Sequence, residues 1–191
     1  MSKNKYVWIP ALLAAAIAIG IFVYSFAVPE VRPERNSTAE LFKNLGTLAV
    51  FCGAVSFLWF RFKSRRNSRS PWIKRLSRWV YYVHQAAGYA AFAAVLAHGG
   101  YFLFYVKMKP DTFMGLSALI ILLALIGYGL SIKRVRNVWI RIAHRTLSIV
   151  WIPFLLIHAG GSAILASVLS AAIWGLVWLM ERHVERNVRQ T

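Results

Sequence analysis

Residues 112–132 have the sequence TFMGLSALIILLALIGYGLSI, and this segment decides the fold. It contains no charged residue, and its length of about 20 residues is what an α-helix needs to cross a hydrocarbon core about 30 Å thick. A helix satisfies every backbone N–H and C=O group internally, which is the condition for exposing a backbone to lipid. We therefore predict that this segment spans a membrane as a helix.

Further apolar segments of similar length lie on both sides of it. The whole chain of 191 residues is 59% hydrophobic and has a mean hydropathy of +0.54, higher than water-soluble domains of this size normally show. No stretch between the apolar segments is long enough to form a soluble domain. We predict an all-α, polytopic helical bundle in the cell membrane, with residues 1–191 as a single transmembrane domain. Its six transmembrane helices are expected at about residues 6–27, 41–60, 79–106, 112–132, 138–158 and 162–180.

Two boundaries in this plan have alternatives. The sequence Ala-Gly-Gly-Ser at residues 159–162 predicts a tight turn, because glycine adopts backbone angles that other residues avoid; the alternative is one long kinked helix. The first segment could be a signal peptide cleaved after Ser25-Phe26-Ala27. Its apolar run of about 20 residues exceeds the usual apolar core of a signal peptide, so we expect it to remain as a helix.

The basic residues predict the orientation. Lys and Arg outnumber Asp and Glu by 23 to 6, and they fall in short runs between the apolar segments. Residues 61–78 contain eight basic residues and residues 133–145 contain five, with no acidic residue in either. Because Lys and Arg in short loops resist translocation, these loops and both termini are expected on the cytoplasmic side. This placement indicates membrane lipid as the anionic partner and argues against nucleic acid.

Four of the five histidines lie inside predicted spans, where ionisable side chains are costly and call for a functional explanation. His84 and His98 are 14 residues apart in the third span, and His144 and His158 are 14 residues apart in the fifth. This spacing is close to four helical turns, so the histidines of one helix point to nearly the same face, about 21 Å apart. The predicted orientation makes the two helices parallel, which gives each pair of histidines two matched depths.

Two imidazoles at one depth offer a pair of trans axial ligands, an arrangement that haem iron accepts. Tetrahedral zinc would need its ligands close together at one level, and the single cysteine, Cys52, excludes a disulfide or a cysteine-based cluster within the chain. Small residues near the histidines leave room for a flat macrocycle, although membrane helices also pack through small residues. The alternative for the histidines is a set of hydrogen-bonded core side chains. We expect two haem b groups, with His84 and His144 binding the inner haem iron and His98 and His158 the outer one.

The stretches that carry these histidines resemble the ferric reductase-like transmembrane domain, which NADPH oxidases and metalloreductases share. The matching residues are His84-Gln85-Ala86-Ala87-Gly88 through His98, and Trp139-Ile140-Arg141-Ile142-Ala143-His144-Arg145 through His158. The resemblance covers the second to sixth predicted helices and implies the same two-haem pairing. Members of that family usually continue into a cytoplasmic flavin and nicotinamide domain, whereas this sequence contains no Gly-rich dinucleotide motif.

We therefore expect transmembrane electron transfer from a cytoplasmic-side reductant to an extracytoplasmic acceptor, by a membrane oxidoreductase or its electron-transfer subunit. The donor would be a separate flavoprotein reductase, a flavin at the cytoplasmic face, or a quinol. One alternative is a quinol-linked cytochrome b membrane-anchor subunit of a redox complex. Others are a non-redox transporter that uses its intramembrane histidines as a relay, and a haem-handling or sensing protein.

Overall fold

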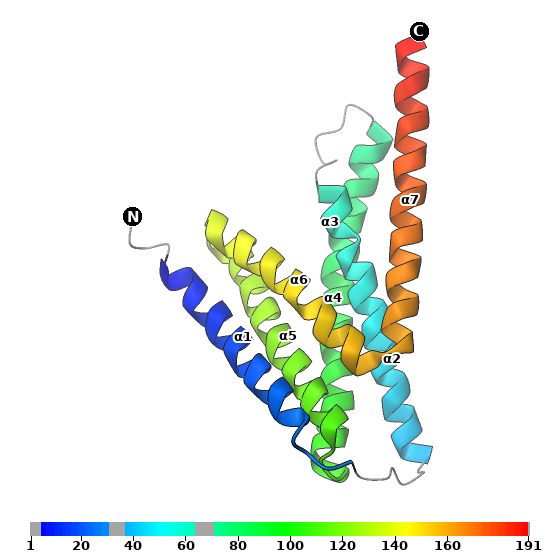
Figure 1. Ribbon diagram of the computed structural model, residues 1–191. Coiled ribbons are helices and arrows are strands. Elements are labelled where there is room, and N and C mark those ends of the chain that lie inside the picture. Colours follow the sequence, from blue (N-terminus) through cyan, green and yellow to red (C-terminus); the bar gives the residue numbers. More distant parts are fainter. Residues whose placement is uncertain (1–4, 31–36, 64–70, 191) are drawn as a thin grey trace. The chain divides into compact units, whose positions relative to one another are not determined.

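The computed structural model describes residues 5–30, 37–63 and 71–190, and throughout these ranges its regular structure is helical (Figure 1). The first part of the chain forms α1 (Lys5–Ser25), α2 (Ser37–Phe57) and the short α3 (Trp59–Phe62). The remainder forms α4 (Pro71–Tyr105), α5 (Pro110–Arg134), α6 (Val138–Ala159) and α7 (Gly161–Gln190).

Each of the six predicted segments contains a helix, and the differences lie at the ends. Helix α4 begins at Pro71 instead of residue 79, and α7 continues to Gln190 instead of ending near residue 180. A proline suits the first turn of a helix because its missing N–H would have no partner there. Hydropathy marks where a helix leaves the apolar layer and says little about where its backbone hydrogen bonds stop.

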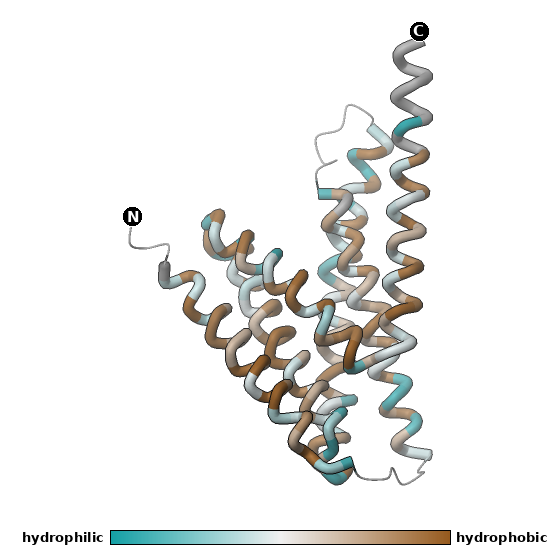
Figure 2. Tube along the Cα trace, in the orientation of Figure 1, coloured by the Kyte–Doolittle hydropathy of each residue, from teal (hydrophilic) through white to brown (hydrophobic). Residues whose placement is uncertain are grey.

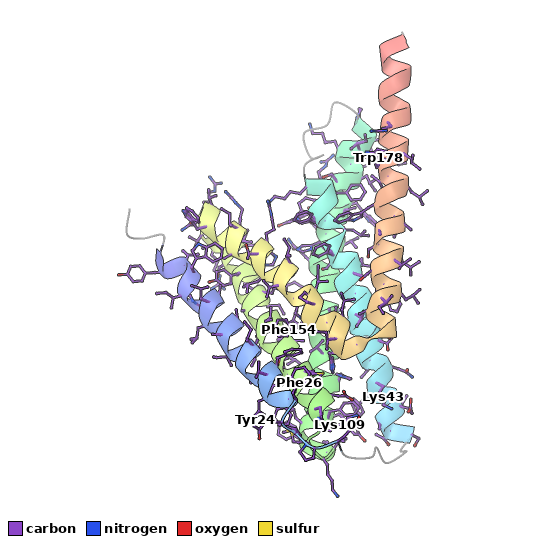
Figure 3. All side chains as sticks on the ribbon, in the orientation of Figure 1. Tyr24, Phe26, Lys43, Lys109, Phe154 and Trp178 are labelled. Atoms are coloured by element: carbon purple, nitrogen blue, oxygen red, sulfur yellow. The ribbon has the colours of Figure 1, made fainter. Side chains whose placement is uncertain are left out.

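Five helical stretches are long and apolar enough to cross a membrane: Tyr6–Ser25, Pro71–Tyr105, Pro110–Arg134, Val138–Ala159 and Gly161–Leu179. Helix α2 is not among them, because charged and amide side chains interrupt its first half. The exposed side chains of Glu40 and Lys43 form an ion pair at 3.0 Å in its first half, and Asn44 follows them. Figure 2 shows hydrophilic colours in this half of α2, and Figure 3 labels Lys43. The chain therefore has the character of a multi-pass membrane protein, with one helix of lower hydropathy than predicted.

The chain divides into two compact units, which are described separately. The first unit consists of residues 1–47 and 92–160, and the second of residues 48–91 and 161–191. The assignment of residues 1–191 to one transmembrane domain stays a prediction.

The core of the first unit lies between α1, α5 and α6, which pack side by side (Figure 1). Ala18 of α1, Ile121 of α5 and Ala143 of α6 are each 0% exposed. Alanine at such positions lets helix backbones approach closely, which is how membrane helices gain van der Waals contact. The apolar face of α1 is thus part of a packed core.

Polar and aromatic contacts join the same helices. The Tyr128 hydroxyl of α5 donates a hydrogen bond to the Val7 carbonyl of α1. Trp151 Nε1 of α6 donates to the Ala118 carbonyl of α5 at 3.0 Å. At the end of α1, the ring of Tyr24 meets a phenylalanine ring of α5 edge to face with centroids 5.2 Å apart (Figure 3).

The boundary between α6 and α7 is the turn that the two glycines predict. Helix α6 ends at Ala159, and Gly160 follows with a φ of 53°, in the left-handed region. The Gly160 N–H still donates to the Leu156 carbonyl at 3.0 Å, which closes the last turn. The prediction of a turn is confirmed, and the alternative of one continuous kinked helix is wrong.

The second unit contains the later part of α2, the whole of α3, the earlier part of α4, and α7. The buried Ser77 hydroxyl of α4 donates to the Phe62 carbonyl of α3 at 3.1 Å. The ring of Trp174 on α7 stacks with Phe57 and Phe60 at centroid distances of 6.1 and 6.2 Å. These contacts tie α7 and α3 to their neighbours within this unit.

The residues that predict the orientation are described only in part. Lys74, Arg75 and Arg78 lie in the first turns of α4. Arg65, Arg66 and Arg69, which belong to the basic stretch at residues 61–78, lie outside the described residues, as does Lys3 near the N-terminus. The cytoplasmic placement of both termini stays a prediction.

Candidate functional site

His98 and His158 come together in the first unit. His98 lies in the later part of α4, and His158 lies in the last turn of α6. Their ring centroids are 6.1 Å apart and their ring planes are inclined by 67°. Both side chains are half-buried. This is the meeting that the equal spacing predicts for the outer pair; that the pair binds an iron porphyrin stays a prediction.

The imidazole of His98 is held against α2. Its Nδ1 atom lies 2.7 Å from the Phe42 carbonyl oxygen. Its ring packs over Gly46, where an added Cβ would lie only 2.8 Å from both Cε1 and Nδ1 of the ring. The rings of Phe42 and Tyr101 stack with centroids 4.1 Å apart and planes within 4°, which keeps this part of α2 against α4.

The imidazole of His158 is held against α5 in a similar way. An added Cβ at Gly115 would lie 2.7 Å from its Cε1 atom. The backbone of Asp111 lies near the ring, but Nδ1 of His158 is fully buried and forms no hydrogen bond of good geometry within the described part of the chain. The Asp111 carboxylate is instead paired with Lys109 Nζ at 3.0 Å, at the start of α5 (Figure 3). The His158 ring thus packs closely against Gly115, and its buried Nδ1 atom has no hydrogen bond within the described residues.

His144 also contacts α5, nearer the other end of that helix. Its Nδ1 atom lies 3.0 Å from the Leu125 carbonyl oxygen. Gly129 faces the ring, and an added Cβ there would lie 3.4 Å from Cε1, an ordinary van der Waals distance. The fit around His144 is therefore looser than the fit around the outer pair.

His84 lies in the second unit, on α4, and is linked to α2 in both directions. Its Nδ1 atom lies 2.8 Å from the Ser56 carbonyl oxygen, and the Ser56 hydroxyl donates to the His84 carbonyl at 2.6 Å. An added Cβ at Gly88 would meet the Ser56 hydroxyl at 3.4 Å. Because His84 and His144 belong to different units, each is described by its own contacts.

Three of the four intramembrane histidines therefore share one feature, an Nδ1 atom against a backbone carbonyl of a neighbouring helix. A carbonyl oxygen can only accept a hydrogen bond, so Nδ1 must carry the proton. In a neutral imidazole this leaves Nε2 unprotonated, with a lone pair available to a metal. Metal-bound histidines typically have this kind of hydrogen bond on their other nitrogen.

The centroid separation of the outer pair can be compared with that of two imidazoles bound to one metal ion. A bond between a metal and an imidazole nitrogen is about 2 Å long, which puts the centroids of two such rings about 6 Å apart. The observed 6.1 Å agrees with that distance. Within the described ranges, no group of three or more His, Cys, Asp or Glu side chains is placed to hold a metal ion.

Sequence reasoning identified the histidines but missed the residues that receive them. These are the carbonyls of Phe42, Ser56 and Leu125 and the glycines at positions 46, 115 and 129. An isolated glycine destabilises a helix by about 1 kcal/mol relative to alanine, so its presence in a sequence suggests a packing or functional reason. Its presence is not a sufficient indication, because Gly127 also lies within α5 and has no atom within 4 Å of the position of an added Cβ.

The chain matches no protein-family model, and it is not significantly similar to any curated protein or solved structure. The resemblance to the ferric reductase-like domain thus depends on the histidine stretches that carry it.

Proposed function

We propose that this chain is a multi-pass membrane cytochrome of the b type, related in plan to the ferric reductase-like transmembrane domain. It would transfer electrons from a cytoplasmic-side reductant to an extracytoplasmic acceptor in the cell membrane. The observation that carries the proposal is the outer pair: two imidazoles on apolar helices, with centroids 6.1 Å apart, each seated against a glycine. Two half-buried histidines on apolar helices are costly unless they serve a function, and together they could hold a haem.

In this proposal His98 and His158 hold the outer haem, and His84 and His144 hold the inner one. Bound haem iron supplies a one-electron redox couple, which none of these side chains provides. The backbone carbonyls hold the proton on Nδ1 of His84, His98 and His144, which fixes each ring and leaves Nε2 available to a metal. Haem iron held by two imidazoles would have no coordination position left for a substrate.

The proposed topology has six spans with both termini in the cytoplasm. It adds α2 to the five helical stretches that are long and apolar enough to cross a membrane. Helix α2 is not among the helices that are apolar enough to cross a membrane by composition alone, but its carbonyl at Phe42 accepts the His98 hydrogen bond at 2.7 Å. If α4 crosses the membrane, the part of α2 that contacts His98 lies at the same depth. The exposed Glu40–Lys43 ion pair would then lie near the headgroups on the extracytoplasmic side.

The electron donor in this proposal is a separate flavoprotein reductase or a quinol. A quinol-linked anchor subunit would use the same four histidines, so the two possibilities differ in the donor alone. Oxidation of an added quinol by membrane vesicles, followed as reduction of the cytochrome spectrum, separates them.

Haem quantitation with a reduced-minus-oxidised spectrum tests the ligands. We expect two haems per purified chain, one haem in His98→Ala and in His158→Ala, and one in His84→Ala and in His144→Ala. His183→Ala, in the basic C-terminal segment, is the matched control and should keep both. A protein without Soret absorbance, or single variants that all retain two haems, would contradict the proposal.

Electron transfer across the membrane is tested in liposomes that contain the purified protein and trapped ferricyanide. Dithionite added outside should bleach the internal ferricyanide at a rate that depends on the protein. His98→Ala and His84→Ala should each reduce that rate to the level of empty liposomes, because either change removes one of the two haems. An unchanged rate in both variants would refute a path through the two sites.

A further inference from the structure

We propose that Gly46 and Gly115 are positioning residues for the outer cofactor site. Each glycine leaves the space into which one ligand imidazole fits against the backbone of a neighbouring helix, Gly46 for His98 and Gly115 for His158. This inference rests on the proposed ligation of haem by those two histidines. It adds two residues that are not ligands themselves but would set how both ligand imidazoles are held.

The distances show how little room there is. A Cβ at Gly46 would lie 2.8 Å from two atoms of the His98 ring, and a Cβ at Gly115 would lie 2.7 Å from Cε1 and 3.0 Å from Nε2 of His158. Carbon atoms in ordinary contact are about 3.5–4.0 Å apart, so any side chain larger than hydrogen displaces the ring. In both cases the displaced atoms belong to the imidazole itself.

Gly46 also lies beside the carbonyl that His98 contacts. Phe42 precedes Gly46 by four residues, and its carbonyl oxygen lies 2.7 Å from Nδ1 of His98. In an α-helix the carbonyl of residue i points at the N–H of residue i+4, so the side chain at i+4 stands beside it. A methyl group at position 46 would therefore stand beside this hydrogen bond as well as against the ring.

Ligation determines how much a displaced ring matters. A free histidine side chain turns about two torsions and can move away from an added methyl group at little cost. In the proposed site the His98 imidazole would be held at both ends, by iron at Nε2 and by the Phe42 carbonyl at Nδ1. The His158 imidazole would be held by iron alone, because its Nδ1 atom forms no hydrogen bond within the described residues. The effect of an added methyl group at Gly46 or Gly115 is therefore expected on cofactor binding rather than on the helices.

The chain contains its own controls. Gly129 leaves 3.4 Å to the His144 ring, so an added Cβ fits there in ordinary contact, and Gly127 on the same helix faces nothing within 4 Å. We therefore expect graded effects from the four alanine variants. Gly46→Ala and Gly115→Ala should weaken retention of the outer haem about 10- to 100-fold, the usual effect of losing support behind a metal-bound histidine. Gly129→Ala and Gly127→Ala should retain both haems.

The experiment measures haem per chain, haem loss to apomyoglobin, and the reduction potential and low-spin electron paramagnetic resonance signal of each haem in the full-length detergent-solubilised protein. In Gly46→Ala and Gly115→Ala we expect faster loss of one haem and a changed signal and potential for that haem alone. Normal retention, signal and potential in both variants would overturn the inference. A wild-type chain without haem would instead overturn the proposed function.

A folding defect is distinguished by removing the imidazole. In a His98→Ala background the ring that meets residue 46 is absent, so adding Gly46→Ala should leave the inner haem and the yield of folded protein unchanged. If Gly46→Ala lowers the yield equally with and without His98, the glycine serves helix packing only, and its role in positioning the ligand is refuted.

Discussion

Replacement of Ala18 by leucine tests the packing of α1 against α5 and α6. Ala18 is 0% exposed, and Ala11, two turns earlier on the same face, is 3% exposed. Leucine adds three carbon atoms where there is no exposed surface to receive them. Overpacking of this kind costs about 1–3 kcal/mol. At about 1.4 kcal/mol for each factor of ten, the equilibrium between the folded and unfolded forms should shift by about 5- to 150-fold.

The assay is unfolding in mixed micelles with an increasing mole fraction of dodecyl sulfate, followed by tryptophan fluorescence. Trp8 and Trp151 both pack against this core and report on its opening. Ala16→Leu is the matched control, because Ala16 lies on the exposed side of the same helix and a leucine there extends into lipid. Equal unfolding midpoints for Ala18→Leu and Ala16→Leu would show that the Ala18 face of α1 is not packed, and would refute the reasoning.

Two further predictions use the same unfolding assay. Tyr128→Phe removes the hydrogen bond to the Val7 carbonyl between α5 and α1 and should cost about 0.6 kcal/mol, and no more than about 1.7, the range for such bonds between membrane helices; an unchanged unfolding midpoint would show that this hydrogen bond does not stabilise the contact between α1 and α5. Gly160→Ala places a Cβ on a residue with a φ of 53° and should cost about 1–3 kcal/mol, whereas Gly161→Ala, with open space around its Cβ position, should cost nothing. Equal costs for these two glycines would contradict the turn.

The equal spacing of the histidines shows how far sequence periodicity reaches into the candidate site. A separation of 14 residues places two side chains on one face of a helix, so the pattern predicts that His98 and His158 meet if their helices are parallel neighbours. The rings of His98 and His158 do meet, with centroids 6.1 Å apart. The same pattern predicts an inner pair of His84 and His144, and that pairing stays a prediction.

The predicted spans were less accurate where a helix is polar at one end. The apolar part of α2 begins after Asn44, and the hydropathy of its earlier turns gives no reason to place them in a membrane. The contact of His98 with the Phe42 carbonyl is the observation that favours such a position. It arises from the packing of α2 against α4, which hydropathy does not describe.

Composition and periodicity were sufficient to predict the helices, their membrane character and the turn at Gly160, and to select the four histidines as candidate site residues. Each of these depends on residues close together in the chain. Composition and periodicity did not predict the partners of each imidazole. Which carbonyl accepts from Nδ1, and which glycine faces the ring, depends on how far one helix is rotated and shifted along its neighbour. That rotation and shift result from side-chain packing between segments distant in sequence, so a local sequence pattern does not predict them.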